Sequence, residues 1–136
     1  MVKISGAQRF TNRLKKMSGA QAKSLTDKAL YAAGQLIEVE AENSITEGSI
    51  SGPGHIPSLP YNPPNADTRQ LDGDIHTVVI GRGRVNVEAG ANTPYAVLLE
   101  FGSSKMLPRP YLNPASQKKS PEAKKLVAEA IRRSTK

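Results

Sequence analysis

The most constraining feature of the chain is a long helical pattern that runs from Ser24 to about Glu47. Ser24, with Asp27 three residues later, is typical of a capped helix start, and Gly48 would end the helix. At 1.5 Å per residue, such a helix is roughly 35 Å long. Its apolar residues form two stripes, Leu25, Ala29, Ala32, Leu36 and Val39 in one, and Leu30, Ala33, Ile37, Ala41 and Ile45 in the other. Because the combined arc is much wider than one core-facing side, we expect part of it to form a subunit interface.

The polar residues of this helix are confined to a narrow wedge, which holds Asp27, Lys28, Gln35, Glu38 and Glu42. Glu40 is the exception, because it falls inside the apolar arc between Leu36 and Ile37. A carboxylate there would carry a desolvation cost unless a basic group or a path to water lies beside it. A Lys or Arg of a neighbouring subunit is therefore a candidate partner for Glu40.

Length and composition favour a single domain over residues 1–136. With 38% hydrophobic residues, 4% aromatic residues and no Trp, the core must consist mainly of aliphatic side chains, and a small core favours support from partner subunits. The absence of cysteine excludes disulfides, thiolate catalysis and cysteine-based zinc sites. The sequence has neither a transmembrane run nor a signal-peptide pattern, so we expect synthesis in the cytoplasm and no membrane partner.

The net charge of +7 is unevenly distributed. Residues 1–23 hold six basic and no acidic side chains, whereas residues 24–50 hold one basic and five acidic ones. The stretch 118–136 is basic again, with seven basic and two acidic side chains. Two basic ends that flank an acidic centre suit either contact with nucleic acid or docking onto acidic neighbouring proteins, and charge alone does not separate the two.

The rest of the chain predicts an α+β fold, in which a long N-terminal helix and a C-terminal helix pack on a small antiparallel sheet. The pattern indicates a first short helix over 7–17, a long proline-rich loop over 48–66, a β-hairpin with strands at 76–80 and 85–89, a third strand at 105–107, and a basic last helix over 120–134. Five of the ten prolines lie in the loop, which we expect to become ordered against neighbouring subunits. Ser120 would cap the last helix and Pro121 would take its first position.

The segment from Tyr95 to Ala115 combines a short apolar helix, a glycine stop and a Pro-Arg-Pro turn. Thr93 would cap the helix, Pro94 would open it, and Gly102 would end it in a left-handed conformation. Charges enclosed by such apolar sequence need partners, so we expect Glu100 and Arg109 to pair with each other or across subunits. The candidate interface residues are Leu36, Ile37, Glu40, Tyr95, Glu100, Phe101, Arg109 and Tyr111.

This segment also carries a family resemblance. Tyr-Ala-Val-Leu-Leu-Glu-Phe-Gly-Ser-Ser-Lys-Met-Leu-Pro-Arg-Pro-Tyr-Leu-Asn-Pro-Ala resembles the signature of the tail-component, neck or tail-completion family of long-tailed, siphovirus-type phages. Upstream, Thr68-Arg69-Gln70-Leu71 stands where that family has a Thr-Gly-Arg-Leu-like element, with Arg69 in place of the usual glycine. The resemblance covers most of the chain and is most specific between Tyr95 and Ala115.

Patterns that would indicate catalysis or metal binding have simpler explanations. His55 and His76 lack metal-ligand spacing, and Ser103-Ser104-Lys105 has no second base or oxyanion site nearby. Asp72 and Asp74 flank Gly73, which is typical of a turn; a small hydrolase built on these two residues and Glu100 is a weak alternative. Neither a catalytic residue, nor a metal ligand, nor a cofactor is predicted.

The resemblance implies a structural virion protein without enzymatic activity, located at the head–tail junction or tail. It implies a homo-oligomeric ring, a hexamer by family analogy, that surrounds the DNA channel between head-connector, stopper or portal-adaptor proteins and tail-terminator or tail-tube proteins. The main alternative is a basic nucleic-acid-binding module in which Arg82 and Arg84 contact duplex phosphates. Non-specific contact with packaged DNA is compatible with either.

Overall fold

The computed structural model describes residues 6–81 and 83–135. Six helices and one β-hairpin are assigned in these ranges. They are α1 (Ala7–Ser18), α2 (Ala20–Thr46), the short 3-10 helix η1 (Gly52–Gly54), α3 (Gln70–Gly73), β1 (His76–Gly81), β2 (Arg84–Glu88), α4 (Ala96–Phe101) and α5 (Leu112–Ser134). The α+β class predicted from the sequence is thus confirmed. None of the described helices is long and apolar enough to cross a membrane.

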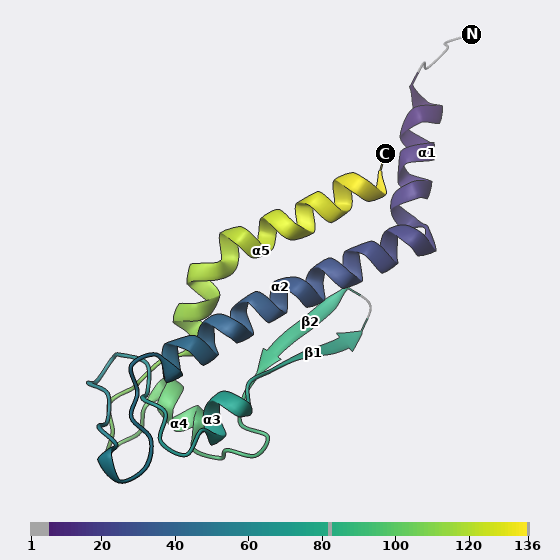
Figure 1. Cartoon of the computed structure of the whole chain (residues 1–136). Coiled ribbons are helices and arrows are strands. Elements are labelled where there is room, and N and C mark those ends of the chain that lie inside the picture. The colour runs from purple at the N-terminus through teal and green to yellow at the C-terminus, as the bar shows by residue number, and fades with distance from the viewer. Residues whose placement is uncertain (1–5, 82, 136) are drawn as a thin grey trace.

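Helix α2 is the spine of the molecule (Figure 1). Helix α5 packs along one side of α2 and the β1–β2 hairpin packs along another. The proline-rich segment, α3 and α4 gather around the C-terminal end of α2 (Figure 1). The main cluster of buried side chains lies at this same end and consists of Ala41, Ile45, Ala66, Leu71, Ile75, Ala96, Tyr111 and Ala115.

The second apolar stripe of α2 is the one that faces this interior. Ala33, Ala41 and Ile45 are buried, and Ile37 packs against the core. The first stripe remains more accessible, because Leu25 and Val39 are exposed and Leu36 is only partly buried. The prediction that α2 has more apolar surface than one subunit covers agrees with these exposures.

The hairpin contacts part of the polar wedge of α2, at Glu38 and Asp27, whereas Lys28 and Gln35 of the wedge are exposed. The Thr77 backbone N–H donates to Glu38 Oε2 at 2.8 Å, and the Gly83 N–H donates to Asp27 Oδ1 at 3.2 Å. Between these two acids, Gly34 lies directly beneath the hairpin. A Cβ added at Gly34 would come within 2.5 Å of Thr77 Cγ2. Gly34 therefore permits the close approach of strand and helix.

The two strands pair antiparallel, with His76 opposite Glu88 and Gly81 opposite Arg84, and an irregularity between Val79 and Gly81. The predicted hairpin is confirmed. The predicted third strand at 105–107 is wrong, because residues 103–106 form a turn closed by the Ser103 N–H, which donates to the Met106 carbonyl at 2.8 Å. Strand geometry is lost there because these backbone groups bond locally.

Two predicted helix starts are also wrong. Helix α2 begins at Ala20, four residues before Ser24, after an extended Gly19 that separates it from α1. Helix α5 begins at Leu112 rather than at Ser120, so Pro121 lies inside the helix. A proline in a helix interior removes one backbone hydrogen bond and crowds the preceding turn, and Figure 1 shows α5 bending along its length.

Candidate subunit interface

Glu100 explains why α5 begins at Leu112. Its carboxylate accepts hydrogen bonds from the backbone N–H groups of Tyr111 at 2.9 Å, Leu112 at 3.0 Å and Asn113 at 2.9 Å. The first N–H groups of a helix have no partner within the helix, and the positive end of the helix dipole favours a carboxylate there. Glu100 at the end of α4 is therefore the cap of α5.

Gly102 and Pro108 make the tight connection between these two helices. Gly102 ends α4 with a φ of 78° and a ψ of 177°, so the positive φ is present but the backbone is not in the left-handed helical conformation that was predicted. A Cβ at this position would lie 2.9 Å from Pro108 Cδ. The Arg109 N–H donates to the Leu99 carbonyl at 2.6 Å and the Tyr61 N–H donates to the Pro108 carbonyl at 2.8 Å. The Pro-Arg-Pro segment is thereby joined to both α4 and the proline-rich segment.

Asp74 holds the loop that leads into α4. Its carboxylate accepts hydrogen bonds from the Gly90 and Asn92 backbone N–H groups, both at 3.0 Å, from the Asn92 side-chain amide at 3.1 Å, and from the Thr93 hydroxyl at 2.7 Å. Thr93 thus binds Asp74 and does not cap α4, contrary to the sequence prediction. The hydrogen bond from Thr93, followed by that from the Asn92 backbone, lowers the pKa of Asp74 from 3.8 to about 2.

We expect Asp74→Asn to lower the thermal midpoint by several degrees, because the new amide N–H would face N–H donors where an oxygen now accepts. The pKa of Asp74 in the folded state is below its ordinary value. Its contribution to the free energy of unfolding is therefore complete above the ordinary pKa and is lost as the pH falls through about 2. The difference between wild type and variant should therefore shrink as the pH falls from about 4 to about 2. Thermal unfolding of both proteins over this pH range measures the difference between their midpoints.

Asp67→Asn is the matched control, since Asp67 is exposed and accepts a hydrogen bond from Gly52. It should leave the midpoint nearly unchanged. A midpoint for Asp74→Asn equal to that of this control would show that Asp74 does not organise the loop.

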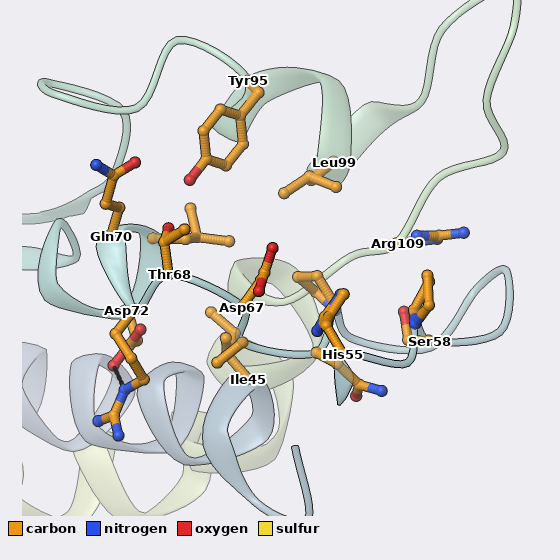
Figure 2. Close-up of a pocket in the computed structure, with 16 residues that line it drawn as sticks. Ile45, His55, Ser58, Asp67, Thr68, Gln70, Asp72, Tyr95, Leu99 and Arg109 are labelled. Carbon is orange, nitrogen blue, oxygen red and sulfur yellow. Dashed lines mark hydrogen bonds and ion pairs between the residues drawn. The ribbon is translucent and has the colours of Figure 1, made fainter. Parts of the chain in front are cut away.

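A cavity of about 370 Å³ lies between α4, the proline-rich segment and α3. Figure 2 shows Tyr95 and Leu99 on one side and Ile45 on the other. Three buried side-chain atoms have no hydrogen-bond partner among the described residues, namely Ser58 Oγ, Asp72 Oδ1 and Arg109 Nε, and all three residues line this cavity. A buried polar atom without a partner is costly, so this cavity is suited to a polar group from outside the chain.

The outer side of α4 is apolar and exposed. Val97, Leu98 and Phe101 point outward, and Phe101 is 78% exposed. Leu107, in the turn that follows, is also exposed. We call these four residues the α4 surface. Monomeric proteins seldom expose contiguous apolar patches of large size, so a surface of this kind is typical of protein contact.

The model of the family described as "Bacteriophage HK97-gp10, putative tail-component" matches residues 8–102, which is more than half of the chain. The chain belongs to the HK97 gp10-like family of phage tail components. Neither curated proteins nor solved structures give a significant match. The family match takes in Tyr95 to Gly102 but ends before the Pro-Arg-Pro segment and α5.

Several residues of this HK97 gp10-like protein that were predicted to lie at an interface pack inside the single chain. Tyr111 is 1% exposed and its hydroxyl donates to the Ala96 carbonyl at 3.3 Å. Burial, followed by the charge of Glu100, raises its pKa to about 12. The assignment of Tyr111 to an interface is therefore corrected: it is a core residue. Ile37 also contributes to core packing.

The charged candidates have partners that differ from those predicted. Glu40 accepts a hydrogen bond from Lys118 of the same chain at 2.6 Å, and Lys119 lies 3.9 Å from its other oxygen. Glu100 binds backbone N–H groups and does not pair with Arg109. Of the eight candidates, two are exposed, Tyr95 and Phe101, and one is buried, Tyr111. The other five are partly buried, namely Leu36, Ile37, Glu40, Glu100 and Arg109.

Arg84, a candidate DNA-facing residue of this phage protein, is exposed at the start of β2. Arg82, the other such candidate, lies outside the described residues.

Arg69, where the resemblance expects glycine, has a φ of 62° and thus adopts the left-handed conformation that glycine favours. Its Nε donates to Asp72 Oδ2 at 2.8 Å. Asp72 and Asp74 thus have separate structural contacts, which the turn composition alone did not indicate.

Proposed function

We propose that this tail component is a structural, non-enzymatic subunit of the head–tail junction of a long-tailed phage, and that copies of it associate into a ring around the DNA channel. The observation that carries the proposal is the exposed α4 surface, three of whose four residues lie within the region matched by the family. Identical copies that meet through different surfaces close into a ring when the rotation between them allows it. Burial of apolar surface would then drive the association.

The cavity beside α4 supports the same proposal. Ser58, Asp72 and Arg109 offer both donors and acceptors there, and a polar group from a neighbouring copy would satisfy them. The proline-rich segment lines one side of this cavity and exposes Ile56, Leu59 and Tyr61. We propose that this segment, together with Tyr95, forms part of the contact between subunits.

The neighbours that we propose are a head connector, stopper or portal adaptor on one side and a tail-terminator or tail-tube protein on the other. The basic stretches at both ends of the chain suit acidic surfaces on such proteins. Assembly into a particle would place the protein in the virion. Contact with the DNA that passes through the ring would be non-specific, with Arg84 as a candidate contact.

Deletion of the gene from the encoding phage tests the location. We expect filled heads and separate tails in place of joined particles, and addition of the purified protein should restore joining. Normal infectious particles without the protein would reject the proposed location. Tight binding of the isolated subunit to duplex DNA at physiological salt, with a steep salt dependence, would instead favour the nucleic-acid-binding alternative.

Phe101→Asp tests the contact surface. Because Phe101 is largely exposed, the variant should fold as the wild type does but lose at least tenfold in self-association, measured by analytical ultracentrifugation. Ala128→Asp, on an exposed position of α5, is the matched control and should associate normally. Equal association of Phe101→Asp and wild type would exclude the α4 surface from the interface.

A further inference from the structure

The apolar face of helix α1 is largely uncovered by the described residues. It contains no buried residue, and Phe10, Leu14 and Met17 are exposed, with Phe10 at 65%. Their spacing of i, i+4 and i+7 is that of anchors by which a helix binds a groove. A helix of about twelve residues is marginally stable in water without tertiary contacts. The apolar face of α1 therefore needs a surface to bind.

The chain changes direction at Gly19, so that α1 projects from the end of α2 (Figure 1). Gly19 adopts an extended conformation between α1 and α2, and Figure 1 shows α1 at the far end of the molecule, beside the end of α5. That end of α5 carries Arg132 and Arg133. Arg9 and Arg13 of α1 have no ion-pair partner among the described residues. Arg132 and Arg133 are also positive, so they cannot neutralise the charge of α1. An acidic surface would suit α1 better.

A groove of suitable chemistry lies between α2 and α5. It has a volume of about 290 Å³ and is lined by Ala32, Gln35, Leu36, Val39, Glu40, Asn43 and Lys119. Its floor is apolar, since Ala32, Leu36 and Val39 belong to one stripe of α2. Val39 remains 51% exposed. The groove therefore offers apolar contact along one side of α2.

The charge around this groove complements that of α1. Glu40 at the groove is paired with Lys118 and Lys119 of α5, so the acid left for a partner at this end of α2 is Glu47, whereas α1 contains four basic side chains and no acidic one. The hydrogen bond with Glu40 raises the pKa of Lys118, and the charge of Glu47 adds a smaller increase. Glu47 therefore lies near this end of the groove. Glu47 is exposed and has no ion-pair partner among the described residues. It is available to Arg9 or Arg13 of another molecule.

The groove is out of reach of the α1 of the same chain. Val39 is twenty residues beyond Gly19, so it lies about 30 Å along α2, whereas α1 is only about 18 Å long. Leu14 could not fold back to Val39 while α2 stays helical. The occupant that fits is the α1 of a second copy.

We propose that α1 of one copy lies in the α2–α5 groove of a neighbouring copy, with Phe10, Leu14 and Met17 on the groove floor and its arginines facing Glu47. This proposal rests on the proposed self-association and adds a contact made by α1 to the one proposed at the α4 surface. The contact joins two different surfaces, so it leads from one copy to the next and is compatible with ring closure.

Cross-linking of two single-cysteine variants tests the contact, because the natural chain contains no cysteine. Leu14→Cys and Val39→Cys subunits carrying different tags are mixed, oxidised, and analysed for a mixed disulfide. We expect that product in high yield. Leu14→Cys mixed with Ala128→Cys is the matched control and should give at least tenfold less, since Ala128 lies on an exposed part of α5 away from the groove lining.

The outcomes separate this proposal from the broader one. Oligomers that form without the Leu14–Val39 disulfide would overturn the placement of α1 and leave ring assembly standing. Wild-type protein that remains monomeric at all concentrations would overturn both. A second measurement uses Leu14→Gln, which should weaken association at least tenfold while the helix content stays near that of wild type. Unchanged association, or binding of α1 to anionic vesicles in its place, would also overturn the proposal.

Discussion

Substitution of Gly34 by valine should destabilise the protein by about 3 kcal/mol, the upper part of the usual range for overpacking. The added Cβ would lie 2.5 Å from Thr77 Cγ2 and 3.0 Å from Val85 Cγ1, so the hairpin would have to move off α2. That movement would also strain the hydrogen bond between the Thr77 N–H and Glu38. Urea denaturation followed by far-ultraviolet circular dichroism measures the loss.

Ser24→Val is the matched control for Gly34→Val, because Ser24 is an exposed residue of the same helix. It introduces the same β-branched side chain without a clash and should cost about 0.5 kcal/mol or less. Gly34→Ala should fall between the two, since it gains about 1 kcal/mol of helix propensity against a smaller clash. Equal stability of Gly34→Val and Ser24→Val would show that the hairpin does not pack closely on α2.

The second large effect is expected at Glu100. Its replacement by alanine leaves three backbone N–H groups at the start of α5 without their acceptor and should cost about 2 kcal/mol, as the loss of a strong helix cap does. Hydrogen exchange should become faster at Tyr111, Leu112 and Asn113 before the rest of α5 is affected.

Two variants make the Glu100 experiment specific. Glu100→Gln keeps one acceptor oxygen and removes the charge, so its loss of stability should be intermediate. Glu129→Ala removes an exposed carboxylate from α5 and should change stability little. A loss at Glu129 as large as that at Glu100 would indicate an effect of net charge and would reject the role of Glu100 as a cap.

Local patterns were sufficient to predict the helix over 7–17, the β-hairpin and the end of the last helix. The start of the last helix was misplaced because its cap comes from Glu100, more than ten residues earlier in the chain. Ser120-Pro121 is a strong local start signal, yet three hydrogen bonds that backbone N–H groups donate to a distant carboxylate place the start of the helix at Leu112. A tertiary contact of this kind has no signature in a local window.

The candidate interface was predictable only in part, for a related reason. Enclosed charges at Glu40, Glu100 and Arg109 indicated that partners were needed, but not which ones. Glu40 pairs with lysine side chains of α5, and Glu100 accepts hydrogen bonds from backbone N–H groups. Asp74 was assigned to a turn, and only the structure shows it binding the loop from Gly90 to Thr93. Apolar spacing predicts burial for Tyr111 equally well in a core and in an interface.

The left-handed backbone at Arg69 has a consequence for which residues this position can hold. A non-glycine residue in that conformation carries roughly 1 kcal/mol of strain, while its ion pair with Asp72, whose arginine side chain is mostly in solvent, returns an amount of similar size. Exchange between arginine and glycine would then be close to neutral for stability. Glycine at position 69 would therefore permit the same backbone path, so Arg69→Gly should leave the turn before α3 in place.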